Sequence, residues 1–209
     1  MLRTENLTFS YSKETKPFEF PDITLKKAEH LLIVGKSGIG KTTFLHLLSG
    51  LLKPNDGIIN IDKIDINNLS SSKLDKFRGE NIGIVFQKNY AVQSLTVLEN
   101  LQARLFFSNQ KVNNTKIDAL LDELDLLHQK NSRTKELSEG QLQRLGIALS
   151  VIHNPKIILA DEPTSSLDDE NCKIVIELLK NQAKKNEANL IVITHDHRIK
   201  PFFQNSITL

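Results

Sequence analysis

Residues 35–42 read G-K-S-G-I-G-K-T, and this pattern restricts the possible folds more than any other part of the 209-residue chain. An apolar run at residues 31–34 precedes it and predicts a buried strand, and an amphipathic run at residues 42–52 predicts a helix. In this setting glycines let backbone amides surround an anion, and the amino end of the helix adds partial positive charge. We therefore predict a phosphate-binding loop rather than an ordinary glycine-rich turn. Lys41 would contact the β- and γ-phosphates of a nucleotide, and the Thr42 hydroxyl would ligate Mg²⁺.

Strand and helix patterns alternate along much of the chain. Apolar runs predict buried strands at residues 31–34, 82–86, 157–160 and 190–193. A helical pattern at residues 174–179 separates the last two, so we predict an α/β fold with a mostly parallel sheet and helices on both faces. Ligand chemistry would lie at the carboxyl ends of the strands. Shorter alternating runs at residues 7–11 and 23–25, with Pro17 and Pro21 between them, predict antiparallel strands.

The segment after the first helix is less regular. Asn-Asp-Gly at residues 55–57 predicts a turn, and residues 58–61 predict a strand. Residues 67–73 are polar and serine-rich, and the pattern assigns no helix or strand to them.

From Gln87 to about Ile152 the sequence shows helical periodicity and no strong strand pattern. Thr96 and Glu99 have the spacing of a capping box. An apolar stripe at helical spacing is formed by Ile117, Leu120, Leu121, Leu124 and Leu127. We predict one domain, in which a helical subdomain at residues 88–152 is inserted into a core formed by residues 1–87 and 153–209.

Composition argues against several classes of protein. The formal net charge is +2 and no basic stripe is present, so nucleic acid is not an expected partner. Cys172 is the only cysteine, the first five residues lack the apolar core of a signal peptide, and no apolar run has the length of a membrane span. We expect a cytoplasmic protein whose membrane role, if any, depends on a partner.

Two acidic residues, Asp161 and Glu162, directly follow the apolar run at residues 157–160. They would lie at the carboxyl edge of the sheet beside the phosphate-binding loop. Asp161 could hold Mg²⁺, and Glu162 could polarise the water that attacks the γ-phosphate. An isolated acid pair before a proline would more simply end a strand and begin a turn, but the phosphate-binding loop favours the catalytic interpretation.

Leu-Ser-Glu-Gly-Gln at residues 137–141 precedes an amphipathic helical pattern. Ser138 and Gln141 have capping-box spacing, which alone indicates a well-capped helix. An exposed helix amino end with a hydroxyl and the open amide of Gly140 is also an anion site. The chain would then contain two phosphate-binding elements that are distant in sequence.

These motifs, in this order, resemble the ATP-binding subunits of ABC transporters over essentially the whole chain. The resemblance assigns nucleotide contacts to Tyr11, Gly35, Ser37, Gly38, Gly40, Lys41, Thr42, Thr43, Ser138, Gly140, Gln141 and Asp168. Residues 35–42 are similar to the Walker A loop, 137–141 to the signature motif, 157–162 to the Walker B strand and 165–168 to the D-loop. Gln87 and His195 occupy the places of the Q-loop glutamine and the switch histidine. The implied fold is a RecA-like P-loop NTPase core with an N-terminal antiparallel β subdomain and an inserted α-helical subdomain.

The resemblance implies an ATPase that works as a head-to-tail homodimer. Each ATP would lie between the Walker A loop of one subunit and residues 138–140 of the other. Catalytic roles would fall to Glu162, His195, Gln87 and Lys41, and Mg²⁺ would be held by Thr42, Gln87 and Asp161. The helical subdomain would receive an integral membrane permease, which would attach the ATPase peripherally to the inner face of the cell membrane.

The chain departs from the family pattern at two places. Glu139 replaces one glycine of Leu-Ser-Gly-Gly-Gln and brings an acid near nucleotide phosphate, which would weaken ATP-driven closure; Leu149 stands where arginine is common. The short end at Leu209 leads us to expect no appended regulatory domain.

Residues 77–87 and 95–100 resemble the branch of lipoprotein-releasing, macrolide-exporting and cell-division ATPases. The leading interpretation is therefore lipoprotein release or related export. The alternative is a cell-division-type or soluble ABC ATPase that acts on an assembly other than a transporter.

Overall fold

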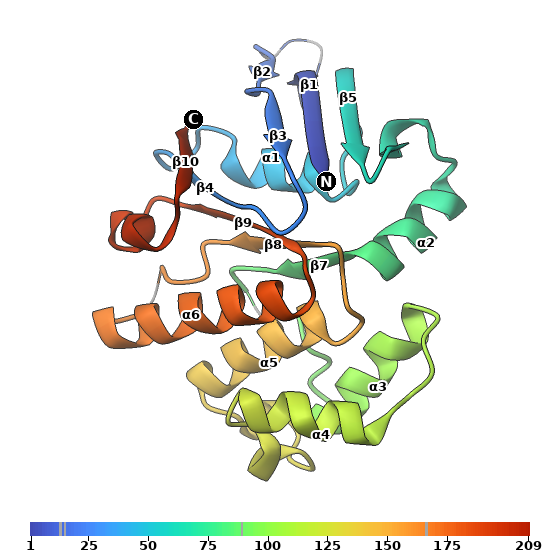
Figure 1. Ribbon diagram of the computed structural model, residues 1–209, viewed down its shortest axis with the longest axis vertical. Coiled ribbons are helices and arrows are strands. Elements are labelled where there is room, and N and C mark those ends of the chain that lie inside the picture. Colours follow the sequence, from blue (N-terminus) through green and yellow to red (C-terminus); the bar gives the residue numbers. More distant parts are fainter. Residues whose placement is uncertain (13, 15, 89, 166) are drawn as a thin grey trace.

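The structure, a computed structural model, describes residues 1–12, 14, 16–88, 90–165 and 167–209. A central parallel sheet has the strand order β10-β4-β9-β8-β7 (Figure 1). Its strands are β4 (His30–Val34), β7 (Ile82–Val85), β8 (Ile157–Asp161), β9 (Asn189–Thr194) and β10 (Asn205–Thr208). Each neighbouring pair is parallel, which confirms the predicted parallel sheet.

A second, antiparallel sheet packs above the first (Figure 1). Its strands are β1 (Leu2–Phe9), β2 (Phe18–Glu19), β3 (Ile23–Leu25), β5 (Asp56–Ile61) and β6 (Ile64–Asp65). The long strand β1 pairs with β2, β3 and β5, so the antiparallel strands predicted before the loop are confirmed.

The described residues form six α-helices and four short 3₁₀ segments. The α-helices are α1 (Lys41–Leu48), α2 (Ser71–Asn81), α3 (Val97–Phe107), α4 (Asn114–Glu123), α5 (Glu139–Val151) and α6 (Asp169–Lys185). The 3₁₀ segments are η1 (Ile66–Asn68), η2 (Leu127–Gln129), η3 (Thr134–Glu136) and η4 (His197–Phe202). No helix in these residues has both the length and the apolar character needed to cross a membrane.

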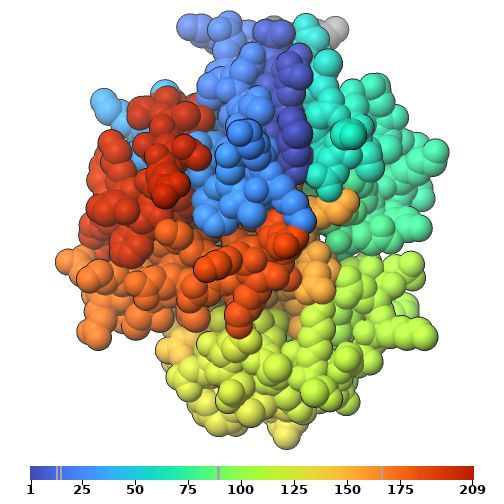
Figure 2. Space-filling model, in the orientation of Figure 1, coloured from blue at the N-terminus to red at the C-terminus, as the bar shows by residue number. Residues whose placement is uncertain are grey.

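Strands β4, β7, β8 and β9 are largely buried on both faces, which explains why they read as continuous apolar runs, whereas the edge strand β10 is mostly exposed. Along β4, Leu31 and Ile33 pack with helix α1 and the antiparallel sheet, whereas Leu32 and Val34 pack with α3, α5 and α6. Helix α1 therefore lies between the two sheets (Figure 1). The green and yellow helical residues after β7 form the lobe at the opposite end of the molecule from the antiparallel sheet (Figure 2).

The first helix is shorter than predicted. It ends at Leu48 rather than residue 52, because Gly50 adopts a left-handed φ of 67° and the amide of Leu51 donates to the carbonyl of His46 at 2.9 Å. The turn predicted at residues 55–57 is also wrong, since Asp56 and Gly57 begin β5. Gly57 has a φ of 98° where the β1–β5 register shifts, so glycine marks a bulge rather than a hairpin turn.

Three further boundaries differ from the sequence pattern. Strand β1 ends at Phe9 instead of residue 11, and helix α2 occupies a stretch to which no element was assigned. Only Phe77 of α2 is buried, so the helix lacks the apolar stripe by which a pattern search finds one. Leu127 does not extend the stripe of α4; it lies in η2 and is 39% exposed.

Candidate active site

The loop at residues 35–40 joins β4 to α1 at the carboxyl edge of the parallel sheet. Gly38 and Gly40 have φ values of 81° and 103°, which L-amino acids rarely adopt. A Cβ on Gly40 would also lie 2.8 Å from Cδ1 of Phe18. The backbone conformation therefore favours glycine at position 40, and a side chain there would also displace the ring of Phe18.

Lys41, the first residue of α1, is buried and points back across this loop. Its Nζ donates to the carbonyls of Gly35 at 2.8 Å and Lys36 at 3.0 Å, and lies 3.5 Å from Oε1 of Glu162. The ammonium group is thus held over the concave side of the loop, where phosphate oxygens would replace or add to its contacts.

Asp161 ends strand β8 and lies beside the loop. Its carboxylate is hydrogen-bonded to the Thr42 side chain, and burial raises its pKa, an effect that the Thr42 bond opposes. Among the described residues, Oδ1 of Asp161 is buried without a hydrogen-bond partner. A hard cation prefers oxygen ligands of this kind, so this pair of residues fits Mg²⁺.

Glu162 follows Asp161 in a left-handed conformation, with φ 49°, that turns its side chain toward β9. Thr194 Oγ1 donates to Glu162 Oε2 at 2.7 Å, and His195 contacts Oε1 through its backbone amide at 3.1 Å and its Nδ1 at 2.9 Å. Burial would raise the pKa of Glu162, but the hydrogen bonds from His195 and Thr194 outweigh it and the pKa lies below its usual value. The carboxylate is therefore kept ionised, as a general base requires.

A cavity of about 360 Å³ joins these groups into one site. Its lining consists of Tyr11, Phe18, Ser37, Gly38, Gly40, Lys41, Thr42, Thr43, Gln87, Glu162 and His195. The structure thus brings together most of the site residues predicted from the sequence. The predicted residues that are not part of this lining are Gly35 and Asp161, which adjoin it, and Ser138, Gly140, Gln141 and Asp168.

Residues 19–165, most of the chain, match the profile of the family described as ABC transporter. The chain belongs to the ABC transporter family. The lipoprotein-releasing system ATP-binding protein LolD of Colwellia psychrerythraea is 35% identical over 185 residues, which cover 88% of this chain and 72% of the relative. The uncharacterized ABC transporter ATP-binding protein YvcR of Bacillus subtilis is 36% identical over 203 residues, which cover 94% of this chain and 78% of the relative.

Solved structures agree with the sequence relatives. The dimeric post-hydrolysis state of the ATP-binding cassette MJ0796, bound to ADP and Pi, superposes with a TM-score of 0.89 and 32% identity, covering 100% of this chain and 94% of that chain. The cbiO1 protein of Clostridium perfringens, part of the ABC transporter complex cbiONQ, gives a TM-score of 0.88 at 29% identity, covering 99% and 83%. This ABC subunit therefore binds and hydrolyses ATP, and the predicted cassette fold is confirmed.

The signature segment of this ABC subunit caps helix α5. Ser138 Oγ accepts from the amide of Gln141 at 3.3 Å, and Gln141 Oε1 accepts from the amide of Ser138 at 2.9 Å, which confirms the predicted capping box. Gly140 is exposed, and a Cβ built on it would meet no atom within 4 Å. The amino end of α5 is therefore open on the surface.

The D-loop adjoins helix α6. Asp168 caps this helix by accepting from the amide of Asn171 at 2.8 Å. Of the D-loop residues predicted from the sequence, Ser166 lies outside the described residues.

Gln87 follows β7 on the exposed side of the cavity and also borders a larger groove of about 1100 Å³. The walls of this groove come from α2, α3, α5 and the segment after β7. Tyr90 and Phe107 line it and are 72% and 76% exposed. Among the residues that the structure describes, two predicted site residues line both the cavity and the groove: Gln87 and Glu162.

Tyr11 is 65% exposed as a residue, and its hydroxyl lies 2.9 Å from Oγ1 of Thr43. Two residues that contact predicted site residues were not found from the sequence. Phe18 makes an edge contact with Tyr11, with ring centroids 6.5 Å apart. Thr194 donates a hydrogen bond to Glu162. Thr194 sits directly before the predicted switch histidine, so its position at the end of a strand was the available signal. No sequence signal singled out Phe18.

Proposed function

We propose that the chain is the ATPase of a lipoprotein-release or related export complex, and that it works as a head-to-tail homodimer around ATP and Mg²⁺. We infer the dimer from one observation: Ser138, Gly140 and Gln141 do not line the chain's own nucleotide cavity. Gly140 is exposed at the amino end of α5, where a second copy would supply the nucleotide phosphates. The names of the LolD relatives support the branch.

In the proposed reaction Lys41 and the amides of residues 35–42 bind and orient the phosphates. Glu162 takes the proton of the attacking water, and Thr194 and His195 hold its carboxylate until phosphate enters. His195 then contacts the γ-phosphate, and Tyr11 stacks on the base. Asp161, Thr42 and Gln87 would hold Mg²⁺, which neutralises charge on the transferred phosphoryl group when bound.

The membrane partner would dock in the groove of about 1100 Å³ beside Gln87. The groove has a mostly apolar surface with exposed aromatic residues and some charged side chains, which suits a short amphipathic helix of a permease. Gln87 lines both this groove and the nucleotide cavity, so a displaced docking helix would move a residue of the nucleotide site. In this proposal residues 88–152 form the subdomain that receives the permease, and the subunit is held at the inner face of the cell membrane.

The second candidate function is a cell-division-type or soluble ABC ATPase. It is favoured by the branch resemblance alone, because the same nucleotide site would serve a non-transport assembly. The identity of the partner separates the two.

The Glu162→Gln substitution tests the proposed chemistry. Hydrolysis by the purified protein should fall at least about a hundredfold, the usual effect of losing a general base, while ATP affinity stays within about threefold. The exposed Glu177 of α6 provides the control, since Glu177→Gln should hydrolyse ATP normally. Normal turnover in Glu162→Gln would remove Glu162 from this role.

The Glu162→Gln protein can then identify the partner, because an ATP-bound form that does not turn over should stay assembled. Purification with ATP and Mg²⁺ from detergent-solubilised membranes should recover an integral membrane protein with few spans and a large external domain. A partner with many spans would indicate a conventional transporter, and soluble partners alone would contradict the transport function.

A further inference from the structure

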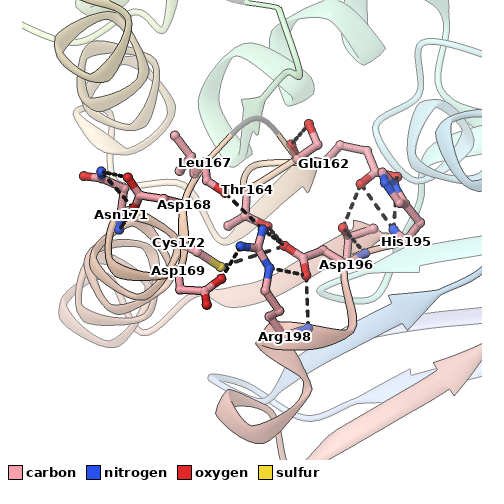
Figure 3. A network of polar contacts seen from close by, with 12 residues as sticks. Glu162, Thr164, Leu167, Asp168, Asp169, Asn171, Cys172, His195, Asp196 and Arg198 are labelled. Atoms are coloured by element: carbon pink, nitrogen blue, oxygen red, sulfur yellow. Dashed lines mark hydrogen bonds and ion pairs between the residues drawn. The ribbon is translucent and has the colours of Figure 1, made fainter.

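Arg198 joins two parts of the ATPase site that are distant in sequence (Figure 3). It lies in η4, three residues after His195. Its Nε donates to Asp196 Oδ1 at 2.9 Å and its Nη2 to Asp196 Oδ2 at 2.8 Å, a bidentate pair. One edge of the guanidinium is therefore fixed to the segment that carries the switch histidine.

The other edge of Arg198 reaches the D-loop and the first residue of α6. Nη1 donates to Asp169 Oδ1 at 2.5 Å, and Nη2 donates to the carbonyl of Leu167 at 3.1 Å. These two residues flank Asp168, the cap of α6. A single planar group thus holds both sides of the D-loop aspartate (Figure 3).

The contacts continue from Asp196 to the proposed general base. Asp196 Oδ2 accepts from Thr164 Oγ1 at 2.9 Å, and the Asp196 amide donates to Thr194 Oγ1 at 2.9 Å. The same Thr194 hydroxyl donates to Glu162 at 2.7 Å. An unbroken series of hydrogen bonds therefore runs from Glu162 through β9 to Arg198 and on to the D-loop.

We propose that Arg198 is a positioning residue for ATP hydrolysis, which locks the D-loop to the strand end that carries Thr194 and His195. The inference rests on the proposed function, in which the D-loop belongs to the surface that meets the second subunit. When the second subunit displaces the D-loop, Arg198 transmits that displacement to the residues that hold Glu162. Arg198 is not among the residues that line the nucleotide cavity, and in this proposal it acts through these neighbours.

The chemistry of the guanidinium explains why another cation would not serve. Arginine presents several donors in a rigid plane, whereas lysine is a single point charge. Asp196 is only 9% exposed, and its hydrogen bonds from Arg198 help lower its pKa to about 2. Lysine at position 198 would still neutralise this carboxylate. With three donors on one nitrogen, it could not make the four bonds that Arg198 makes to Asp196, Leu167 and Asp169 from three nitrogens. Arg198→Lys therefore separates the positioning role from simple charge neutralisation.

The test compares steady-state ATP hydrolysis of the wild type, Arg198→Lys and Arg198→Ala. We expect kcat to fall at least about tenfold in both variants with KM for ATP within about twofold, since the nucleotide contacts are untouched. The melting temperature of Arg198→Lys should stay within about 3 °C of the wild type. Arg3→Lys is the matched control, because Arg3 also pairs with an acid two residues away, Glu5 at 2.5 Å, on the distant strand β1.

A second measurement uses ATP-dependent dimer formation by light scattering. In the Glu162→Gln background, adding Arg198→Lys should raise the ATP concentration needed for dimerisation, whereas adding Arg3→Lys should not. Unchanged kcat and dimerisation in Arg198→Lys would overturn the proposal. A loss of activity that only parallels a loss of thermal stability, with kcat per folded molecule unchanged, would also overturn it.

The two proposals fail in different ways. If Glu162→Gln hydrolyses ATP at the wild-type rate, the proposed active site is wrong. If Glu162→Gln is inactive and Arg198→Lys is fully active, the active site stands and only the positioning role is wrong.

Discussion

At the scale of single residues, Lys41 shows how the loop is prepared for an anion. A buried ammonium group costs free energy unless it is hydrogen-bonded, and here the loop's own carbonyls at Gly35 and Lys36 satisfy it. Glu162 lies 3.5 Å away on the other side of the charge. Lys41 therefore both closes the loop and marks where negative charge is stabilised.

Replacing Lys41 with Ala should consequently have two effects. Affinity for ATP should fall at least about tenfold, because a charge-assisted contact to phosphate is lost, and the melting temperature should fall by a few degrees, about the effect of losing 1 kcal/mol. Isothermal titration with ATP and a thermal melt would measure both. Lys36→Ala is the control, because it removes one exposed positive charge from the same loop. Normal ATP affinity in Lys41→Ala would contradict the phosphate-binding role.

The sequence was informative at this scale because the phosphate-binding loop needs particular residues at fixed spacing. Glycines at 38 and 40 follow from backbone angles, and the acids at the end of β8 follow from strand geometry. The hydrogen-bond partners of Glu162 were harder to predict from the sequence. The bonds from Thr194 and the link through Arg198 arise only when β8 and β9 lie side by side, and a single sequence does not state that pairing.

At the scale of elements, a buried polar cluster attaches α3 to the sheet. His153, which is fully buried just after α5, places Nε2 2.8 Å from Nη2 of Arg104 on α3 and 3.2 Å from the carbonyl of Ile82 on β7. Arg104 also donates to the carbonyl of Gly79 at 3.1 Å. Burial, reinforced by the Arg104 charge, lowers the pKa of His153 to about 3.

This cluster predicts an acid-sensitive attachment. Between pH 6.5 and 3 the unfolded chain binds a proton at His153 and the folded chain does not, so stability falls as pH falls through this window. From pH 7 to pH 5 the loss should be about 2 kcal/mol in the free energy of unfolding. Urea unfolding of the wild type and of His153→Gln at pH 7 and pH 5 isolates the contribution of His153. The difference between their free energies of unfolding should be smaller at pH 5 by that amount.

The exposed His128 of η2 gives the comparison for this experiment. His128→Gln should leave the pH dependence unchanged. A stability difference between wild type and His153→Gln that is the same at pH 7 and pH 5 would show that His153 titrates normally in the folded protein.

Elements were predictable where their burial pattern was strong. The buried strands of the parallel sheet and the capped helices α3 and α5 follow directly from apolar runs and capping boxes. Helix α2 was not predictable in this way, because it buries one side chain and depends on packing beside β7 for its place. The bulge at Gly57 was misread as a turn for a related reason: only the pairing of β5 with β1 shows that the chain continues as a strand.

At the scale of the whole molecule, the proposed head-to-tail dimer requires each chain to hold half of two different nucleotide sites. The cavity beside residues 35–42 has Lys41 and Glu162 but no signature residue in its lining. The amino end of α5 offers Ser138 and the open surface at Gly140 with no phosphate-binding loop beside them. The order of motifs in the sequence suggested this division through family resemblance, and the geometry of one chain is consistent with it.

Gly140 provides the sharpest test of that division. Because a Cβ on Gly140 meets nothing within 4 Å in the isolated chain, Gly140→Ala should keep or slightly raise the melting temperature, as alanine favours a helix by up to about 1 kcal/mol over glycine. If the second subunit's nucleotide packs on this surface, the same methyl group should block its approach and lower ATP-dependent dimerisation and hydrolysis at least about tenfold. The neighbouring exposed Glu139 supplies the comparison, since Glu139→Ala removes an acid from the same surface and should strengthen closure. Gly140→Ala that is thermally stable yet dimerises and hydrolyses ATP like the wild type would mean that the amino end of α5 faces solvent during turnover, and that the head-to-tail arrangement is wrong.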